Sequence, residues 1–399
     1  MNVCPTGRSG SDLVPEPQDP GRSMDVLVIG AGPAGLALGF ELKRRGLRFL
    51  ILEKGAAVAD SWRRMPNRLK LVSPWKTNFL PGSDKHFWPR HHQNSREEFL
   101  LYLQEYAREH TLPVRAKVDV QAVEQKTEAE ELFRVQTSEG IYHSRAVVNA
   151  TGYFSNPFLP EIPGAPESGL PQLHVAEYQD PQTVRKRSGL SRGLVLIIGQ
   201  RLSAGQTMVE LIDGGFEVAI SHRSPIRFGT GPLGWWILFR IFPWLEWIKL
   251  KRLGAKAPGN DVRMQGGRAR KLIQSRRVKT FPAVRRFEKR RVLFEDGSEL
   301  RPDLVIYATG FRPALQHLAP LALRLDPQTG LPALRDLESV TVPGLYFLGI
   351  DGGRNFQSRF IRGIRQDVVF LARRLEEQLC LDPVNENKTY GDPRAVQTA

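Results

Sequence analysis

Cysteine is nearly absent from this chain. Only Cys4 and Cys380 occur among the 399 residues, near opposite ends, and no C-x-x-C pair exists. A disulfide framework, a cysteine zinc site and a redox-active dithiol are therefore excluded. This cysteine usage fits a reducing compartment, so we expect a cytoplasmic protein.

Apolar leader segments and metal-ligand spacings are also missing. Residues 1–23 hold Pro, Gly, Ser and mixed charge without an apolar run, which predicts a flexible leader rather than a signal peptide. Residues 381–399 are expected to form a flexible tail. Among the eight histidines the only close pair is His91–His92, whose adjacent positions are better explained by a surface loop. No metal site is expected.

Acidic residues are outnumbered by basic ones. The chain has 57 Lys and Arg against 42 Asp and Glu, and residues 263–291 alone contain 12 basic residues and one acid, Glu288. Such a run could attract phosphates, nucleic acid or an anionic membrane surface. Because nothing here resembles a nucleic-acid module, we interpret it as a solvated basic face and expect no nucleic-acid partner.

A tryptophan-rich stretch, residues 232–250, holds four of the seven tryptophans. Charged residues and a proline interrupt it, so it is too short and too charged to span a bilayer. Three interpretations stay open: an insertion that covers the active site, a peripheral membrane contact through residues 232–252, and an oligomer interface. The second would make the cytoplasmic protein membrane-associated.

What the chain does contain is a strand, glycine turn, helix and second strand at residues 25–55. The turn reads GAGPAG, which is typical of a dinucleotide site: one glycine permits the tight turn, one lets the backbone approach a pyrophosphate, and one lets the helix pack on the strand. At the end of the second strand Glu53 can accept hydrogen bonds from a ribose 2′-hydroxyl. The turn comprises Gly30, Gly32, Pro33, Ala34 and Gly35.

The same pattern returns with a strand at Gly193–Gly199, a helix after it and a strand at Phe216–Arg223. Its turn is less regular, since Gly199 is followed by Arg201 and then by Ser203 and Ala204 at the helix start. At the position equivalent to Glu53 stand Ser221, His222 and Arg223. Donors in place of an acid favour a 2′-phosphate, so the second site predicts NADPH rather than NADH.

Two strands end in the same Ala-Thr-Gly sequence, one before the second unit and one after it, at Thr151–Gly152 and Thr309–Gly310. This repeat predicts that the second unit is inserted into the first. We therefore expect an α/β fold with two Rossmann-like domains. The first comprises residues 24–160 and 305–380, and the second comprises residues 161–304.

From Met24 to Leu379 the chain resembles the flavin-containing monooxygenases, especially the YUCCA-like branch and its bacterial relatives. The resemblance rests on GAGPAG, both Ala-Thr-Gly segments and the stretches Ser61–Arg64, Arg68–Gly82, Glu98–Ala107, His174–Tyr178 and Val342–Gly349. It implies an enzyme that binds FAD at the first turn and NADPH at the second. Through a flavin hydroperoxide, such an enzyme would transfer one oxygen atom from dioxygen to a small organic substrate.

The resemblance also implies roles for further residues. FAD contacts would come, besides the glycine turn and Glu53, from Lys54, Trp62, Arg63, Thr151, Gly152 and Asp351. NADPH contacts would include Thr309 and Gly310 besides the second turn and Ser221–Arg223. For the reacting centre the sequence offers only Asn78 and Gln357, each of which has an ordinary structural explanation as a loop or capping residue.

Two alternatives stay open. The family fingerprint F-x-G-x-x-x-H-x-x-x-(Y/F) is matched at His174 and Tyr178, but its Phe is absent and Gly169 lies one residue too far upstream. The protein could therefore be an NADPH-dependent flavin oxidoreductase or dehydrogenase that inserts no oxygen. Arg201 in the second turn motivates the other alternative, a flavin-binding regulatory protein with a decayed NADPH site.

Overall fold

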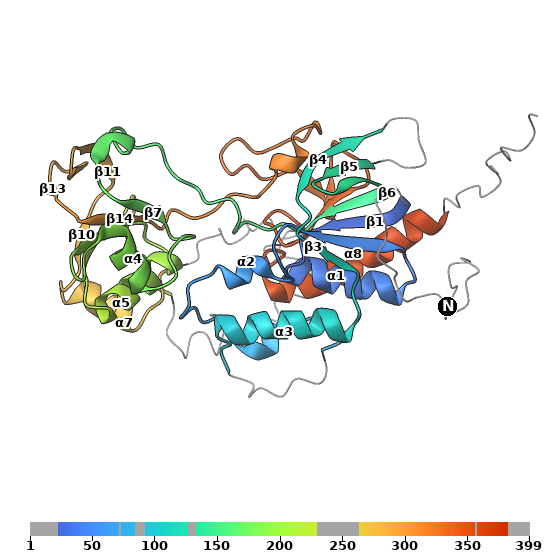
Figure 1. Ribbon diagram of the computed structural model, residues 1–399, viewed down its shortest axis with the longest axis horizontal. Coiled ribbons are helices and arrows are strands. Elements are labelled where there is room, and N and C mark those ends of the chain that lie inside the picture. Colours follow the sequence, from blue (N-terminus) through green and yellow to red (C-terminus); the bar gives the residue numbers. More distant parts are fainter. Residues whose placement is uncertain are drawn as a thin grey trace, which may run out of the picture.

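The computed structural model describes residues 23–71, 73–83, 92–126, 133–229, 263–355 and 357–381, which form two lobes side by side (Figure 1). The leader up to residue 22, His91, the segment 232–252 and the tail from residue 382 lie outside the described residues, so the expectations about them stay predictions. The first strand begins at Ser23, one residue inside the expected leader.

The first lobe is built on a sheet with the order β15-β16-β17-β6-β1-β2-β3, in which β4 and β5 extend from β6. Strands β1, β2, β3, β6 and β17 are parallel neighbours, whereas β4, β5, β15 and β16 pair antiparallel. The bounds are β1 Ser23–Ile29, β2 Phe49–Glu53, β3 Val114–Ala116, β4 Val120–Gln125, β5 Phe133–Thr137, β6 Gly140–Asn149, β15 Leu334–Arg335, β16 Glu338–Ser339 and β17 Leu345–Phe347.

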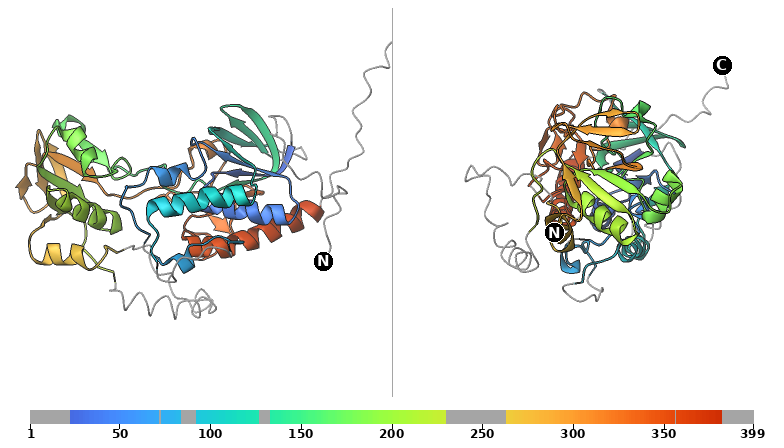
Figure 2. Two further views of the ribbon diagram at one scale, coloured as in Figure 1. Left: turned by 60° about the horizontal axis from the view of Figure 1, so that its bottom comes forward. Right: turned by 90° about the vertical axis from the view of Figure 1, so that its left-hand side faces the viewer.

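Helices cover one face of this sheet. Alternate side chains of β1 point to opposite faces of the sheet. Val26 and Val28 pack against the helices, whereas Leu27 and Ile29 pack against β4 and β5. The helical elements of the lobe are α1 Pro33–Arg44, α2 Asp60–Arg63, α3 Arg96–Glu109, α8 Ile361–Leu381 and the 3₁₀ turns Trp75–Thr77 and Gln316–Leu318. Figure 2 shows α1 and α8 lying along each other on this side.

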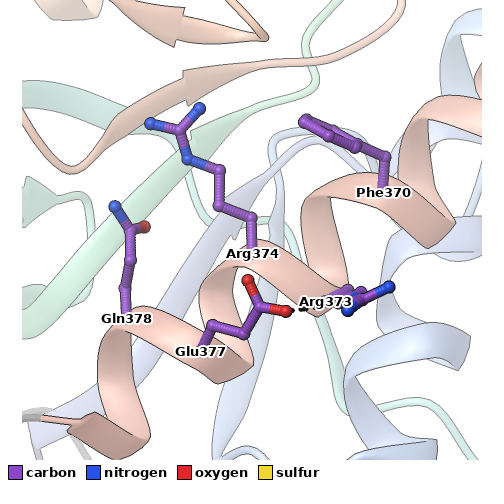
Figure 3. Close-up of a pocket in the computed structure, with 5 residues that line it drawn as sticks. All are labelled: Phe370, Arg373, Arg374, Glu377 and Gln378. Atoms are coloured by element: carbon purple, nitrogen blue, oxygen red, sulfur yellow. Dashed lines mark hydrogen bonds and ion pairs between the residues drawn. The ribbon is translucent and has the colours of Figure 1, made fainter.

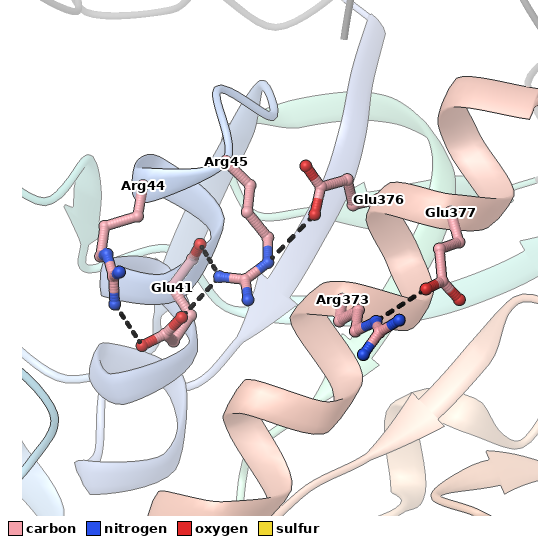
Figure 4. Close-up of polar contacts among 6 residues, drawn as sticks. All are labelled: Glu41, Arg44, Arg45, Arg373, Glu376 and Glu377. Atoms are coloured by element: carbon pink, nitrogen blue, oxygen red, sulfur yellow. Dashed lines mark hydrogen bonds and ion pairs between the residues drawn. The ribbon is translucent and has the colours of Figure 1, made fainter. Parts of the chain in front are cut away.

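An ion network fastens α1 to α8. The buried carboxylate of Glu41 binds Arg44 and Arg45 at 3.3 and 2.5 Å, and Arg45 also reaches Glu376 on α8 at 3.3 Å (Figure 4). Since removal of one partner would leave a buried charge unpaired, this network is a structural link between the helices.

The second lobe holds a fully parallel sheet with the order β10-β9-β8-β14-β7. Its strands are β7 Gln172–His174, β8 Leu194–Ile198, β9 Glu217–Ser221, β10 Lys279–Phe281 and β14 Leu304–Tyr307. A small antiparallel sheet of β11 Val284–Glu288, β12 Arg291–Phe294 and β13 Glu299–Leu300 packs on one face. The helical elements are α4 Pro181–Ser188, α5 Leu202–Asp213, α7 Arg268–Gln274 and the 3₁₀ turn Pro166–Ser168.

Strand β14 corrects one predicted boundary. The sequence places the return to the first domain at residue 305, but Leu304–Tyr307 lies between β8 and β7 in the second sheet. The chain therefore leaves the second lobe after Tyr307. A strand's neighbours in a parallel sheet come from distant parts of the chain, so the apolar run alone does not reveal which sheet it joins.

Two segments connect the lobes, and they run beside each other. The N–H of Phe158 donates to the carbonyl of Gly310 at 3.0 Å, and the N–H of Ala314 donates to the carbonyl of Gly152 at 3.2 Å. The hydroxyl of Thr151 donates to the carbonyl of Ala314 at 3.0 Å. Both Ala-Thr-Gly segments thus lie at the crossing between the lobes, as their repetition predicts.

Within the described part of the chain, no helix has both the length and the apolar character needed to cross a membrane.

Candidate active site

The first glycine turn has two crowded glycines and one open glycine. A Cβ on Gly30 would lie 2.8 Å from the carbonyl oxygen of Ala150, and one on Gly35 would overlap the carbonyl oxygen of Gly30. Around a Cβ on Gly32, by contrast, there is no atom within 4 Å. The turn is therefore packed tightly against β6 and α1 but leaves room above Gly32, where the backbone can approach a ligand.

The open glycine lies at the N-terminus of α1. Leu36 donates the first helical hydrogen bond to Gly32, so the N–H groups of Ala34 and Gly35 precede the helical ladder, and Pro33 has none. Unpaired N–H groups and the helix dipole favour an anion at this end. The residues present thus fit the pyrophosphate of a dinucleotide.

Glu53 ends β2 directly beside the turn. One carboxylate oxygen accepts the N–H of Ala31 at 2.8 Å and the other accepts the N–H of Gly55 at 2.7 Å. These bonds orient the carboxylate and leave lone pairs for a ribose hydroxyl. Lys54, by contrast, points outward and pairs with Asp119 at 3.0 Å.

The second turn repeats this geometry with a different middle residue. A Cβ on Gly199 would overlap the carbonyl oxygen of Ala308, which corresponds to the contact of Gly30 with Ala150. Arg201 is the N-cap of α5 and its side chain is exposed. The first helical bond runs from Gly205 to Arg201, so the N–H groups of Ser203 and Ala204 precede the ladder. The helix end needed for a pyrophosphate is therefore present here too.

Three residues at the end of β9 are expected to bind the 2′-phosphate of NADPH, but only two of them can face a ligand. Arg223 is exposed and His222 is half-buried, so both can face a ligand. Ser221 is buried and its hydroxyl donates to the carbonyl of Pro282 at 2.7 Å, which directs it toward the segment after β10. Gln200, which the sequence does not predict as a site residue, connects the turn to the segment after β9, because its side-chain oxygen accepts the N–H of Ser224 at 3.1 Å.

A cavity of about 560 Å³ lies between the lobes. The first lobe contributes Trp62, Met65 and Arg68 to its wall, and the second contributes Leu202, Gln206 and Glu210. Phe154 and Phe311, whose ring centres are 5.2 Å apart, come from the two crossing segments. A cavity between two nucleotide-binding lobes is a usual place for a ligand that must meet both cofactors.

Glu210 is the buried acid of this cavity. One of its carboxylate oxygens lacks a hydrogen-bond partner among the described residues, and burial raises its pKa above the ordinary value while Tyr178 and Arg68 oppose that shift. Glu210 could not be predicted from the sequence, because a glutamate in an amphipathic helix is usually solvated. A separate hollow of about 540 Å³ lies along α8 and is lined by Phe370, Arg373, Arg374, Glu377 and Gln378 (Figure 3).

Comparison with known proteins agrees with this geometry. Residues 27–349 match the family described as pyridine nucleotide-disulphide oxidoreductase. An uncharacterised CzcO-like oxidoreductase of Geobacillus kaustophilus is 30% identical over 356 residues, 87% of this chain and 97% of that protein. The probable indole-3-pyruvate monooxygenase YUCCA1 of Arabidopsis thaliana is 28% identical over 72% of this chain and 75% of its own.

A solved structure is similar as well. The flavin-containing monooxygenase from Stenotrophomonas maltophilia is 27% identical, with a TM-score of 0.73 over 89% of this chain and 99% of its own. The chain belongs to the flavin-containing monooxygenase family. The predicted α/β fold with two Rossmann-type domains is thereby confirmed. As a member of the family, the protein is a flavin-dependent oxidoreductase whose cofactors are FAD and NADPH.

Of the other residues expected from the family, Trp62 lines the cavity, whereas Arg63 and Asp351 pair with neighbouring side chains. Trp62 lines the cavity and its ring stands edge-on to Phe99 at 4.6 Å. Arg63 is half-exposed and lies 3.7 Å from Asp60 on the same helix. Asp351 accepts hydrogen bonds from Tyr153 at 3.0 Å and from Arg359 at 3.1 Å, so its carboxylate is already oriented.

The two candidates for the reacting centre of this monooxygenase-family chain are both buried. Asn78 is 2% exposed, and its side-chain amide is held by Ser73, which donates to its oxygen at 2.6 Å and accepts from its nitrogen at 3.0 Å. Gln357 is 4% exposed and lies in the loop before α8. Neither residue lines the cavity between the lobes.

His174 and Tyr178 of the fingerprint support the second lobe. Nδ1 of His174 accepts the N–H of Ala176 at 3.1 Å, and its ring contacts Phe311 with a centre-to-centre distance of 5.0 Å. Burial lowers the pKa of His174, so its ring is neutral at physiological pH. Tyr178 is fully buried beside Glu210. Both residues thus shape the wall behind the cavity.

Proposed function

We propose that the first glycine turn binds FAD, that the second binds NADPH, and that the protein transfers one oxygen atom from dioxygen to a small organic substrate in the cavity between the lobes. The observation that carries this proposal is the cavity itself. Its walls come from both dinucleotide lobes, and the crossing segments with Phe154 and Phe311 close one side of it.

Each turn supports its assignment through the residue that follows the second strand. Glu53 offers a carboxylate to a ribose with a free 2′-hydroxyl, as in FAD, and would repel a 2′-phosphate. Arg223 and His222 offer donors to a 2′-phosphate, as in NADPH. FAD held at the first turn would supply the hydride-accepting and oxygen chemistry.

The protein's own part is to bind, orient and exclude water. The helix ends of α1 and α5 would hold the two pyrophosphates, and Trp62, Met65 and Phe154 provide the apolar part of the cavity wall. Glu210 supplies an acid whose pKa is raised by burial, so near neutral pH it holds a proton more readily than an exposed carboxylate. This arrangement gives the cavity one proton-holding group on the NADPH side.

The test is isotopic. Small organic substrates are screened by their ability to accelerate NADPH consumption, and the products are then analysed by mass spectrometry after turnover under ¹⁸O₂. We expect one ¹⁸O atom in the product and the other in water. If hydrogen peroxide is the only oxygen product with every compound that stimulates NADPH consumption, the protein is a flavin oxidoreductase that inserts no oxygen.

A further inference from the structure

The loop between β17 and α8 borders the expected FAD site. Gly349 has φ of +73°, and a Cβ there would lie 3.4 Å from Cβ of Ala34, so the chain leaving β17 runs against the first turn of α1. Two residues later Asp351 is fixed by Tyr153 and Arg359. This loop, described at residues 348–355 and 357–360, therefore starts beside the helix end that fits a pyrophosphate.

Ser358 determines the shape of the same loop. It is 1% exposed, and its hydroxyl oxygen accepts the N–H groups of Arg354 at 3.1 Å and Asn355 at 3.2 Å. The loop also packs directly on α8, because a Cβ on Gly363 would overlap the carbonyl oxygen of Gln357. Small shifts of α8 side chains in this region would thus be transmitted to the loop.

Asp367, on the second turn of α8, faces this loop from inside the protein. Its side chain is 0% exposed, and neither carboxylate oxygen makes a hydrogen bond of normal geometry with the described residues. Nη1 of Arg354 lies 3.7 Å from Oδ1, beyond hydrogen-bond distance. The guanidinium of Arg354 in turn lies 3.9 Å from the ring centre of Phe370, one turn further along α8.

A buried carboxylate without hydrogen bonds lowers the stability of the folded protein. Burial raises the pKa of Asp367 to about 6, although the Ser358 hydroxyl and Arg354 act in the opposite direction. Arg354 is the charged group that acts on it. Asp351 and Arg359 pair with each other, and the nearby part of α8 meets α1 through apolar side chains. A neutral residue would therefore be more stable here, so the acid calls for a functional reason.

We propose that Asp367 is a positioning residue for FAD: through Arg354 and Ser358 it holds the β17–α8 loop in the conformation that borders the bound dinucleotide. The ionised carboxylate attracts the Arg354 guanidinium, and the Ser358 hydroxyl favours the same ionised form. This role rests on the proposed FAD site at the first turn, and it is independent of whether oxygen is transferred.

The test uses the full-length apoprotein titrated with FAD between pH 5 and pH 8, with flavin fluorescence as the readout. The variant is Asp367→Asn, and the control is Glu41→Gln, which also neutralises a buried acid but on the far part of α1 (Figure 4). Asp367→Asn is expected to weaken FAD binding about tenfold at pH 8. Its apoprotein should melt at the same temperature as wild type or higher, because the ionisation penalty is gone.

The pH dependence separates positioning from a purely structural role. Wild-type affinity should fall as the pH drops through about 6, where Asp367 takes up a proton, and Asp367→Asn should show no such fall. Glu41→Gln should lower the melting temperature yet keep both the affinity and its pH dependence. Retention of wild-type affinity by Asp367→Asn, within twofold at pH 8, would overturn the proposal.

Ser358→Ala provides the test if Asp367→Asn does not fold, because it removes the hydroxyl that binds the loop backbone while the acid remains. It should weaken FAD binding in the same direction, and unchanged affinity would count against the proposal. Wild-type protein that binds no FAD would overturn both the site and this role. Full FAD binding without oxygen transfer would contradict only the proposed reaction.

Discussion

The carboxylate of Glu53 accepts the N–H of Ala31 at 2.8 Å and so ties the end of β2 to the glycine turn before α1. The residue that we propose binds the ribose is thus fixed by the same loop that we propose receives the pyrophosphate. The two proposed contacts with the dinucleotide belong to a single rigid unit, which would lower the cost of ordering the site on binding.

Replacing Glu53 by Ala removes both this connection and the ribose acceptor. Hydrogen bonds to a charged group contribute about 1.5–3 kcal/mol each, so FAD affinity should fall at least tenfold. Glu97→Ala, at an exposed position on α3, is the matched control and should bind FAD like wild type. Equilibrium titration of the apoproteins measures both, and equal affinities would contradict the role of Glu53.

The open and crowded glycines of the first turn should respond differently to the same methyl group. Gly32→Ala places a Cβ in free space, so the apoprotein should keep its melting temperature while FAD affinity drops at least tenfold. Gly35→Ala forces its Cβ against the carbonyl oxygen of Gly30 and should destabilise the apoprotein itself. Thermal melts and FAD titrations of both variants check this contrast, which a purely structural turn would not show.

Arg223→Ala should weaken NADPH much more than NADH, because only NADPH carries the 2′-phosphate. One charge-assisted bond contributes about 1.5–3 kcal/mol, so the ratio of the two KM values should change roughly tenfold or more. Ser221→Ala is the control: its hydroxyl faces Pro282, so the cofactor preference should stay unchanged. Equal losses for both cofactors in Arg223→Ala would remove the phosphate assignment.

The sequence predicts both βαβ units, since each depends on local signals: the glycine turn, the helical spacing after it and the terminal Glu53 or Arg223. It misplaces β14 and misses Glu210 and Asp367, because these depend on contacts between distant segments. For Ser221 the sequence predicts the position but not the orientation of the side chain. Its position after β9 is predictable, but the direction of its hydroxyl depends on β10, which lies about 60 residues later in the chain.

His317 should make the protein sensitive to acid. It is 9% exposed, its Nε2 bonds to Oδ1 of Asn149 at 3.1 Å, and burial lowers its pKa to about 4. A histidine with a lowered folded-state pKa stabilises the fold above pH 6.5, and this stability is lost as the pH falls from 6.5 to 4. The loss reaches about 3 kcal/mol.

Urea unfolding of wild type and His317→Gln across this range measures the effect. The variant should be less stable than wild type at pH 7.5, because it weakens a buried contact, yet lose less stability than wild type between pH 6.5 and pH 4. The difference between the two plots of unfolding free energy against pH isolates His317 from other groups that titrate in the same pH range. Parallel plots would contradict its assignment as the acid-sensitive group.

The most direct test of the whole account is anaerobic mixing of the FAD-loaded protein with NADPH in a stopped-flow spectrometer. If the two turns hold FAD and NADPH in contact across the cavity, the oxidised flavin absorbance should bleach on the timescale of turnover, and more slowly in Arg223→Ala at limiting NADPH. Bound FAD that stays oxidised in the presence of saturating NADPH would contradict the account.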